Sequence, residues 1–447
     1  MHRQLAVLFV TLAVSAGVGA QELTLADSVA AALGSNPEIR AASARAAAAA
    51  ERAKGGKRHR LPKIGLSESF VYSNQPAEVF ALSLNQARFD LGEFFVSDPN
   101  NPDPLATWIT RVDLELPVYT GGKLSARIDQ AKNMATAEDM ALGHTREKVA
   151  FETITAYVNL AKAREHTQLM EMARATTSEH VRLAEQYAKQ GLVLEADLMQ
   201  ARVHLAHMDE LVTAADNGAR LALAALNFQM GTDQNLPRDL ESMPPPPVIA
   251  GDLDGWIDLA LEDRQDLAAA KSRLAAGRLE QRAVRPGYFP EIAVVGNYGL
   301  FDDRIFGANG HSGSIMAVAR INLFGGGADP SASAAAGHEA AGFEADIQRF
   351  EEGIALAVQQ AWRDLGTART RRETAHSALA AAAEALRVRE SRFKQGLDKM
   401  ADLLDAETAL REAQTRELVA RYDVSLNAYR LLYEAGASLI NTLEVSR

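Results

Sequence analysis

The sequence predicts an internally duplicated fold of mixed α and β class, in which each half supplies two strands and one long helical hairpin. Three observations lead to this prediction: a repeated pattern, two long stretches without proline, and four segments of alternating apolar and polar residues. The 447 residues are enough for several domains. The formal charge of −11 argues against a nucleic-acid partner, because nucleic acids favour a basic surface.

The N-terminus is expected to be a secretory signal peptide over residues 1–20. A short polar start precedes an apolar run from Leu5 to Val14, and small residues at 18–20 suit cleavage before residue 21. The chain has no cysteine, which excludes disulfides, thiol nucleophiles and thiolate metal ligands. The mature protein is therefore expected to act after export.

A pattern in the first half of the chain returns in the second half. Lys-Gln-Gly-Leu at 189–192 recurs at 394–397, and Ala-Asp-Leu at 196–198 recurs at 401–403. Such self-similarity is typical of a repeated structural unit. The predicted organisation is a first repeat over 21–231, a proline-rich connection over 232–253, a second repeat over 254–436 and a tail over 437–447.

Each repeat is expected to contain one long helical hairpin. The stretch from about 122 to 189 has no proline, and as one helix it would run roughly 100 Å at about 1.5 Å per residue. In the second repeat, large apolar residues and alanines recur at alternating spacings of four and three from Ile354 to Phe393, which is a heptad pattern. Gly191 and Gly396 are plausible helix C-caps. The hairpins are predicted over about 122–231 with a tip near 191, and over about 328–436 with a tip near 396.

Four segments predict strands. Apolar residues from Trp108 to Val118 alternate with Arg111, Asp113 and Glu115, and similar alternation occurs at 292–300, at 315–323 and, more weakly, at 64–72. The predicted β-hairpins cover about 62–118, with a long loop, and about 290–324. Runs of about ten residues suit tilted membrane strands. Four strands cannot close around a pore, and open edges are not tolerated in lipid, so closure requires three copies and twelve strands.

These features together resemble the TolC-type outer-membrane efflux proteins. The resemblance covers essentially all of the mature chain and rests on the duplicated plan and on short motifs in matching order. The motifs are Asn-Pro-Glu-Ile at 36–39 with its counterpart at 264–267, Leu-Pro at 61–62, Phe-Pro at 289–290, and Pro-Val-Tyr-Thr-Gly-Gly at 117–122. The implied fold is a homotrimeric 12-stranded outer-membrane β-barrel with four strands per subunit, continued by a long α-helical coiled-coil barrel with a mixed equatorial region. The implied barrel-to-helix turns are Gly121, Gly122, Gly326 and Gly327.

The resemblance also implies a function and partners. The chain would be the exit duct of a tripartite efflux or type I secretion system, placed in the outer membrane of a Gram-negative cell with a long periplasmic extension. It would meet outer-membrane lipid, a periplasmic adaptor (membrane fusion) protein and an inner-membrane transporter of the RND, ABC or MFS type. The alternative is a periplasmic coiled-coil scaffold or adaptor that never enters the membrane.

Two groups of residues near the tips are candidate functional sites. Asp402 and Asp405 are three residues apart and share a helix face. In the family register they would form a carboxylate ring that attracts cations, with Asp197 as a weaker match in the first repeat, whereas the alternative is a solvated helix face. The candidate adaptor-contact residues, whose alternative role is tip capping and packing, are Gly191, Leu192, Gly396 and Leu397.

The remaining motifs predict no enzyme, cofactor or metal site. His204 and His207 have a spacing that can bind a metal, but both are expected on the surface. The glycines at 325–327 lack the Lys-Ser/Thr of a phosphate-binding loop. Phe393 and Asp398 stand where the family can carry a tyrosine and an arginine that link the hairpins. Closure of the tip is therefore expected to rest on hydrophobic contact and loose electrostatics.

Overall fold

The computed structural model describes residues 22–96, 98–191, 193–284, 289–324 and 326–445. The predicted signal peptide over 1–20 and the candidate tip residue Leu192 lie outside the described residues. The chain divides into two compact units. The first comprises the residues up to Ala41 together with Gly143–Arg264 and Glu352–Arg447, and the second comprises Ala42–Leu142 and Gln265–Glu351.

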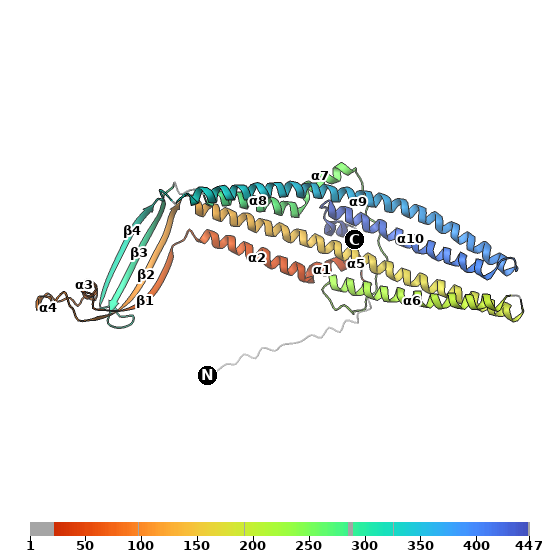
Figure 1. The fold of residues 1–447 in the computed structure, drawn as a ribbon, viewed down its shortest axis with the longest axis horizontal. Coiled ribbons are helices and arrows are strands. Elements are labelled where there is room, and N and C mark those ends of the chain that lie inside the picture. Colours follow the sequence, from red (N-terminus) through yellow and green to blue (C-terminus); the bar gives the residue numbers. More distant parts are fainter. Residues whose placement is uncertain (1–21, 97, 192, 285–288, 325, 446–447) are drawn as a thin grey trace, which may run out of the picture. The chain divides into compact units, whose positions relative to one another are not determined.

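Two long helical hairpins dominate the first unit (Figure 1). Helix α5 (Lys123–Lys189) is followed by α6 (Glu195–Gln229), and α9 (Ala328–Lys394) is followed by α10 (Met400–Glu434). Helices α5 and α9 each have 67 residues, and α6 and α10 each have 35. Nowhere in the described part of the chain is a helix both long enough and apolar enough to cross a membrane.

The heptad pattern of α9 is only partly buried. The residues from Ile354 to Ala368 that follow the pattern are buried, which confirms the prediction for this part of the helix. Arg372 and Arg389 fall on the same pattern but are exposed. A guanidinium cannot be buried cheaply without a partner, so the pattern continues along the sequence while close packing does not.

A large apolar cluster surrounds the middle of the long helices in the first unit. It joins Tyr157 of α5, Leu226 of α6 and Tyr429 of α10 to the short helices α1 (Leu25–Ser35) and α11 (Leu439–Val445), and the half-buried Trp256 of α7 (Leu253–Asp263) packs against it. The Tyr157 hydroxyl lies 3.0 Å from both the Leu23 and the Glu241 carbonyl oxygens. Leu23 also forms an isolated parallel bridge with Leu240. The N-terminal segment, the proline-rich connection and the C-terminal segment thus pack on one core.

The second unit contains a four-stranded antiparallel sheet in the order β1-β2-β3-β4 (Figure 1). The predicted strands are confirmed, with these bounds: β1 Lys63–Ser73, β2 Leu105–Thr120, β3 Glu291–Asp302 and β4 Gly310–Arg320. Helix α2 (Pro37–Arg58) precedes β1, and helix α8 (Gln265–Ala283) precedes β3. β1 and β4 are the outer strands.

The connection between β1 and β2 is more ordered than the predicted loop. It contains helix α3 (Pro76–Asn85) and helix α4 (Leu91–Val96). Pro76 occupies the first position of α3, where its fixed φ angle favours a helix and its missing N–H is not needed. Leu82 then buries its side chain against the sheet, and this tertiary contact stabilises a helix of only 10 residues.

Candidate functional site

Both hairpin tips turn on a glycine in the left-handed conformation. The φ angles are 73° at Gly191 and 72° at Gly396, a region that a residue with a Cβ rarely adopts. The N–H of Gly396 donates to the Phe393 carbonyl at 2.9 Å, and that of Gly191 donates to the Ala188 carbonyl at 3.0 Å. Leu397 follows the second glycine with 62% of its surface exposed. The glycines thus cap their helices and leave an apolar side chain at the second tip.

A buried carboxylate reinforces the second tip. The Asp398 side chain is only 4% exposed and accepts hydrogen bonds from Arg392 at 2.9 Å and from Arg389 at 3.1 Å. The hydrogen bond from Arg392, with a further one from Arg389, holds the pKa of Asp398 below its usual value. Asp398 is thus held by two charged hydrogen bonds within its own hairpin, and the expectation of how the tip closes stays a prediction. Val193 stands at the matching place of the first repeat, so that tip lacks this carboxylate.

The candidate ring carboxylates lie in the first two turns of their helices. Asp402 is half-buried, and its Oδ2 accepts from the Lys399 N–H at 3.3 Å, so it caps its own helix. Asp405, one turn further along α10, is exposed. Asp197 is half-buried in the first turn of α6, where the helix dipole also favours a negative charge. Asp402 therefore has a capping role that sequence reasoning did not assign.

An apolar cluster joins the two hairpins of the chain at their tips. The rings of Tyr187 and Phe393 lie 6.1 Å apart between centroids. The expectation that tip closure rests on hydrophobic contact stays a prediction. The buried members are Val181, Ala184, Leu198 and Ala201 from the first hairpin and Phe393, Met400, Leu403 and Leu404 from the second.

One polar pair is buried between the hairpins beside this cluster. Nδ1 of His180 on α5 contacts Oε1 of Glu407 on α10, and their side chains are 8% and 7% exposed. The Thr177 hydroxyl lies 3.4 Å from the other Glu407 oxygen. Sequence reasoning missed this pair, because the two residues lie in different repeats and no short motif connects them. Like the apolar tip cluster, this pair joins the first hairpin to the second.

The two histidines with metal-ligand spacing lie in different surroundings. His204 is half-buried and lines a cavity of about 120 Å³ together with Glu407, so the expectation of a surface position is wrong for it. Burial lowers the pKa of His204 below its usual value. His207 is exposed and lies 3.6 Å from Glu210. No group of three potential metal ligands occurs in the part of the chain that the structure describes.

Paired glycines connect the strands to the long helices. Gly121 and Gly122 precede α5 with φ angles of 62° and 85°, and Gly326 and Gly327 precede α9 with angles of 65° and 81°. A Cβ on Gly121 would lie 3.2 Å from the Cβ of Phe289, which is tighter than usual. The backbone at these turns therefore requires glycine, as expected for structural turns. Gly325 lies outside the described residues.

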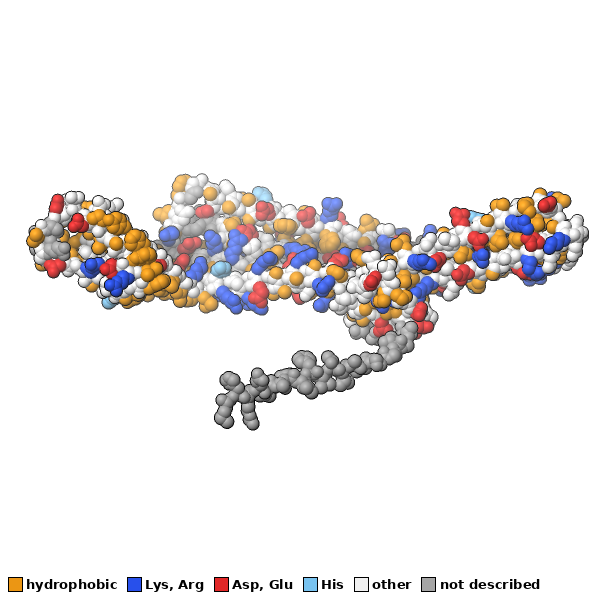
Figure 2. All heavy atoms as spheres, turned by 90° about the horizontal axis from the view of Figure 1, so that it is seen from below, with side chains coloured by type: hydrophobic (Ala, Val, Ile, Leu, Met, Phe, Trp, Pro, Cys, Tyr) orange, Lys and Arg blue, Asp and Glu red, His pale blue; other side chains and the backbone are white. Residues whose placement is uncertain are grey.

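The sheet has one apolar and one polar face. Its register aligns Ile64, Leu114, Gly296 and Ile315 across all four strands, and the side chains of Ile64 and Ile315 are 72% and 75% exposed. Figure 2 shows hydrophobic side chains gathered over the sheet, whereas charged ones are scattered along the helices. The opposite face carries the charged residues of β2. Exposed apolar surfaces of this extent mark contacts with a membrane or another protein.

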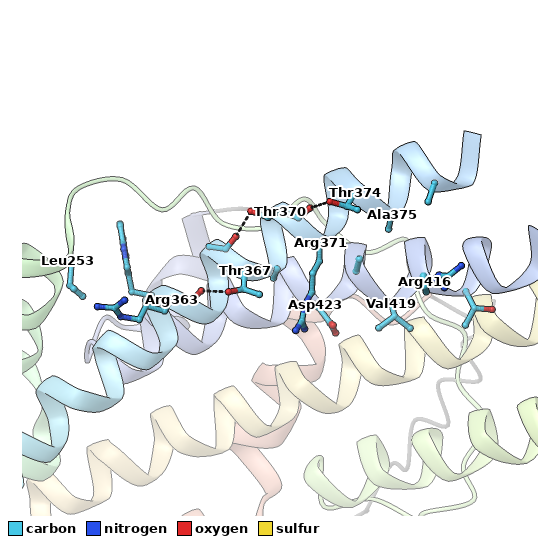
Figure 3. Close-up of a pocket in the computed structure, with 16 residues that line it drawn as sticks. Leu253, Arg363, Thr367, Thr370, Arg371, Thr374, Ala375, Arg416, Val419 and Asp423 are labelled. Atoms are coloured by element: carbon cyan, nitrogen blue, oxygen red, sulfur yellow. Dashed lines mark hydrogen bonds between the residues drawn. The ribbon is translucent and has the colours of Figure 1, made fainter. Parts of the chain in front are cut away.

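A groove opens between α9 and α10 in the first unit (Figure 3). Its volume is about 1420 Å³, and Trp362 and Val419 contribute apolar surface. The Thr367 hydroxyl donates back to the Arg363 carbonyl at 3.0 Å, so its polar group is satisfied within the helix. Arg371 and Asp423 point toward each other across the groove in Figure 3. Sequence reasoning missed this groove, although the run of small residues and threonines over 366–378 was a usable signal.

Comparisons with known proteins relate the chain to bacterial outer-membrane proteins. The family model described as Outer membrane efflux protein matches residues 29–232 and 256–437. Protein CyaE of Bordetella pertussis is 26% identical over 344 residues, which cover 73% of this chain and 70% of CyaE. Outer membrane protein OprJ of Pseudomonas aeruginosa is 25% identical over 359 residues, covering 74% of this chain and 72% of OprJ. The crystal structure of the outer membrane protein VceC from Vibrio cholerae superposes with a TM-score of 0.78 at 18% identity, covering 92% of this chain and 96% of VceC.

Proposed function

We propose, from the premise that this chain belongs to the outer membrane efflux protein family, that it is the exit duct of a tripartite efflux or type I secretion system. Members of the family are outer-membrane channels of the TolC type, not enzymes, as the resemblance implied. The observation that best supports a duct is the largely apolar face of the sheet, which is backed by a polar face, although Glu68 and Thr110 interrupt the apolar side. Such a sheet can face lipid on one side and water on the other.

Closure of the sheet requires further copies of the chain. β1 and β4 each have 11 residues and form the two edges, whose backbone groups need partners in lipid. Pairing of β4 in one copy with β1 in the next satisfies both edges. Three copies with four strands each then form a twelve-stranded β-barrel, which is wide enough for an open channel. A homotrimer is thus the proposed assembly.

The long hairpins form the periplasmic part of the proposed duct. Two hairpins per subunit give six in the trimer, arranged as a coiled-coil barrel that extends from the outer membrane. The groove between α9 and α10 is unfilled within one copy, and most of its lining surface is apolar. Beside it, the heptad residue Arg372 of α9 is exposed. We propose that a helix of the neighbouring copy packs into this groove, because closure of the ring brings a second copy against the helices of the first.

The tips are the proposed gate and docking site. Asp405 is exposed and would supply the main charge of a cation-binding carboxylate ring, while Asp402 caps its helix and contributes less. The glycine tips with Leu397, and by family position Leu192, would contact a periplasmic adaptor. An inner-membrane transporter of the RND, ABC or MFS type would deliver the cargo, which the duct conducts passively.

The assembly is tested by fractionation followed by sizing and planar-bilayer recording. We expect the protein in the outer-membrane fraction, as a detergent-extracted trimer that forms ion-conducting channels. A monomer recovered from the soluble periplasm would reject the duct and favour the scaffold alternative. This single experiment separates the two classes because a scaffold has no need to form channels.

The gate is tested by substitutions on α10. Asp405→Ala should weaken block of single channels by divalent cations, whereas Glu412→Ala, an exposed acidic residue of the same helix, should leave block unchanged. Equal block in both variants rejects the carboxylate ring. For docking, Leu397→Asp should abolish transport while the trimer persists on sizing, and normal transport by that variant rejects the adaptor contact.

A further inference from the structure

The connection between β1 and β2 carries an element that the duct function does not require. Residues 76–96, called the insert below, contain α3 and α4 and pack against the ends of β2 and β4 (Figure 1). These strand ends lie away from Lys63, where β1 begins after α2, and away from Thr120, where β2 leads into α5. In the proposed duct, they are therefore at the outer end of the barrel.

The insert lies on the polar face of the sheet. Its buried Leu82 packs against Ile109 of β2 and Phe301 of β3. Ile109 and Phe301 are paired neighbours, and Ile109 shares its face with Arg111 and Asp113, because side chains alternate along a strand. The apolar face, which carries Trp108 and Val112 on β2, is the other one. The insert thus covers the face that would line the lumen, not the face that would contact lipid.

Buried polar groups fix the insert to this face. Gln86 is fully buried, and its amide donates to the Ala106 carbonyl at 3.1 Å and to the Thr107 hydroxyl at 2.6 Å. Loss of such hydrogen bonds leaves buried groups unsatisfied, which costs about 1–3 kcal/mol for each. The Asn85 carbonyl oxygen lies 1.8 Å from where a Cβ on Gly310 would stand, so only glycine allows this approach.

The insert also holds a strained residue. Ala87 has a φ angle of 57°, a conformation that residues other than glycine seldom adopt. Such a residue costs about 1–3 kcal/mol and persists only where its surroundings fix it. Next to it, Nη1 of Arg88 lies 3.4 Å from Oδ2 of Asp303, which belongs to the β3–β4 connection. Contacts of Leu82, Gln86 and Arg88 thus hold the end of α3 and the turn after it against the sheet.

Three aromatic rings lie on the insert away from the sheet. Phe80 contacts Phe89 and Phe94 at centroid distances of 5.3 and 5.7 Å, and Phe89 and Phe94 lie 5.6 Å apart. Phe80 is two residues from Leu82 on the same helix, so the two side chains point to different sides. Because Leu82 faces the sheet, Phe80 is directed away from it, and Phe80 is exposed.

We propose that the insert is an exit constriction of the duct, lined by the aromatic cluster of Phe80, Phe89 and Phe94. This inference rests on the proposed function. Twelve strands spaced about 4.8 Å apart and tilted about 40° form a ring about 24 Å across. Three helices about 10 Å thick, packed around one axis, fill about 22 Å. Three inserts therefore narrow the outer end to an aromatic collar, which selects against large or strongly hydrated solutes.

Single-channel recording of the whole protein in planar bilayers tests this constriction. In one variant, a short Gly-Ser turn replaces residues 75–103. In a milder one, Phe80→Ala removes one ring per subunit and leaves the anchors intact. We expect a several-fold larger conductance for the first variant, a smaller increase for the second, and passage of larger uncharged polymers in both. The matched control is Ser83→Ala, in the same helix, whose hydroxyl bonds back to the Phe80 carbonyl.

The outcomes separate the two proposals. If the native protein forms channels and both variants have its conductance and polymer cut-off, the constriction is rejected while the duct stands. If the native protein forms no channels, the duct itself is rejected. If the shortened variant fails to assemble, Phe80→Ala decides, since it alters only an exposed ring.

Discussion

The buried pair of His180 and Glu407 allows a quantitative test of how the two hairpins are held together. His180→Ala removes the partner of a carboxylate that is only 7% exposed. Breaking a buried pair by deleting one partner costs about 3–5 kcal/mol, because the remaining polar group stays in a poorly solvated site. Each 1.4 kcal/mol is about a tenfold change in an equilibrium. Local separation of α5 from α10 should therefore become about 10²–10³ times more frequent.

Hydrogen–deuterium exchange of the detergent-purified protein measures this separation. Peptides covering 177–187 and 403–414 should exchange about 10²–10³ times faster in His180→Ala than in the native protein. The control is Glu179→Ala, one residue away, which removes an ion pair with Arg182 whose side chains are 57% and 59% exposed. It should have little effect, because water already solvates such pairs.

A double variant separates the pair from simple loss of volume. His180→Leu combined with Glu407→Leu replaces both polar groups by apolar ones, and this exchange is often neutral or stabilising at buried sites. In the double variant, protection of the same peptides against hydrogen–deuterium exchange should return to the native level or exceed it. Native-like exchange in His180→Ala, or equally fast exchange in the single and double variants, would refute the reasoning.

Four further substitutions test other features through stability. Gly231→Ala should destabilise the fold by about 1–3 kcal/mol, since its φ angle is 64° and the Ser35 carbonyl oxygen lies 2.8 Å from the added Cβ. Gly218→Ala, in the open middle of α6, should instead stabilise it by about 1 kcal/mol, and chemical denaturation distinguishes the two signs. Tyr157→Phe should lower the free energy of unfolding by about 1–3 kcal/mol, because it removes the hydroxyl that contacts the Leu23 and Glu241 carbonyl oxygens. Burial raises the pKa of Tyr157 to about 12, so native stability should fall as the pH rises from 10 to 12, and the Phe variant should lack this loss in melting curves. Because its pKa is lowered in the folded state, Asp398 contributes to the free energy of unfolding above pH 3.8. This contribution is lost as the pH falls through the lower folded-state pKa. Asp398→Asn should melt earlier at pH 7 and lack this acid dependence.

The elements that the sequence predicts well are those whose cause is local. The α9 pattern from Ile354 to Ala368 and the alternation along β2 reflect periodicities of 3.6 and 2 residues, which are visible in any short window. The tip glycines are also predictable from the sequence, because a left-handed helix C-cap strongly prefers glycine. The ion pairs of Asp398 could also have been predicted, since both of its arginine partners lie within nine residues on the same hairpin.

Features that depend on tertiary contact were not accessible in the same way. The Thr177 hydroxyl is 230 residues away from Glu407 along the chain, so no window of sequence contains the buried cluster between the hairpins. Gln86 is much closer to its partners, at 20 and 21 residues, but its burial still depends on the start of β2 folding over it. The sequence shows Pro76 and the apolar residues of α3, but not which face of the sheet they cover. That choice is made by packing against Ile109 and Phe301.

The packing of the first helix against the last has a consequence for the order of folding. Leu25 and Val29 of α1 share a core with Leu439 and Leu443 of α11, so the ends of the chain meet in one cluster. Chains emerge from the ribosome N-terminus first, and contacts distant in sequence form late and slowly. The apolar face of α1 is therefore completely covered only once α11 has packed against it. Substitutions that remove Leu439 and Leu443 would therefore uncover apolar surface of α1 that lies more than 400 residues away along the chain.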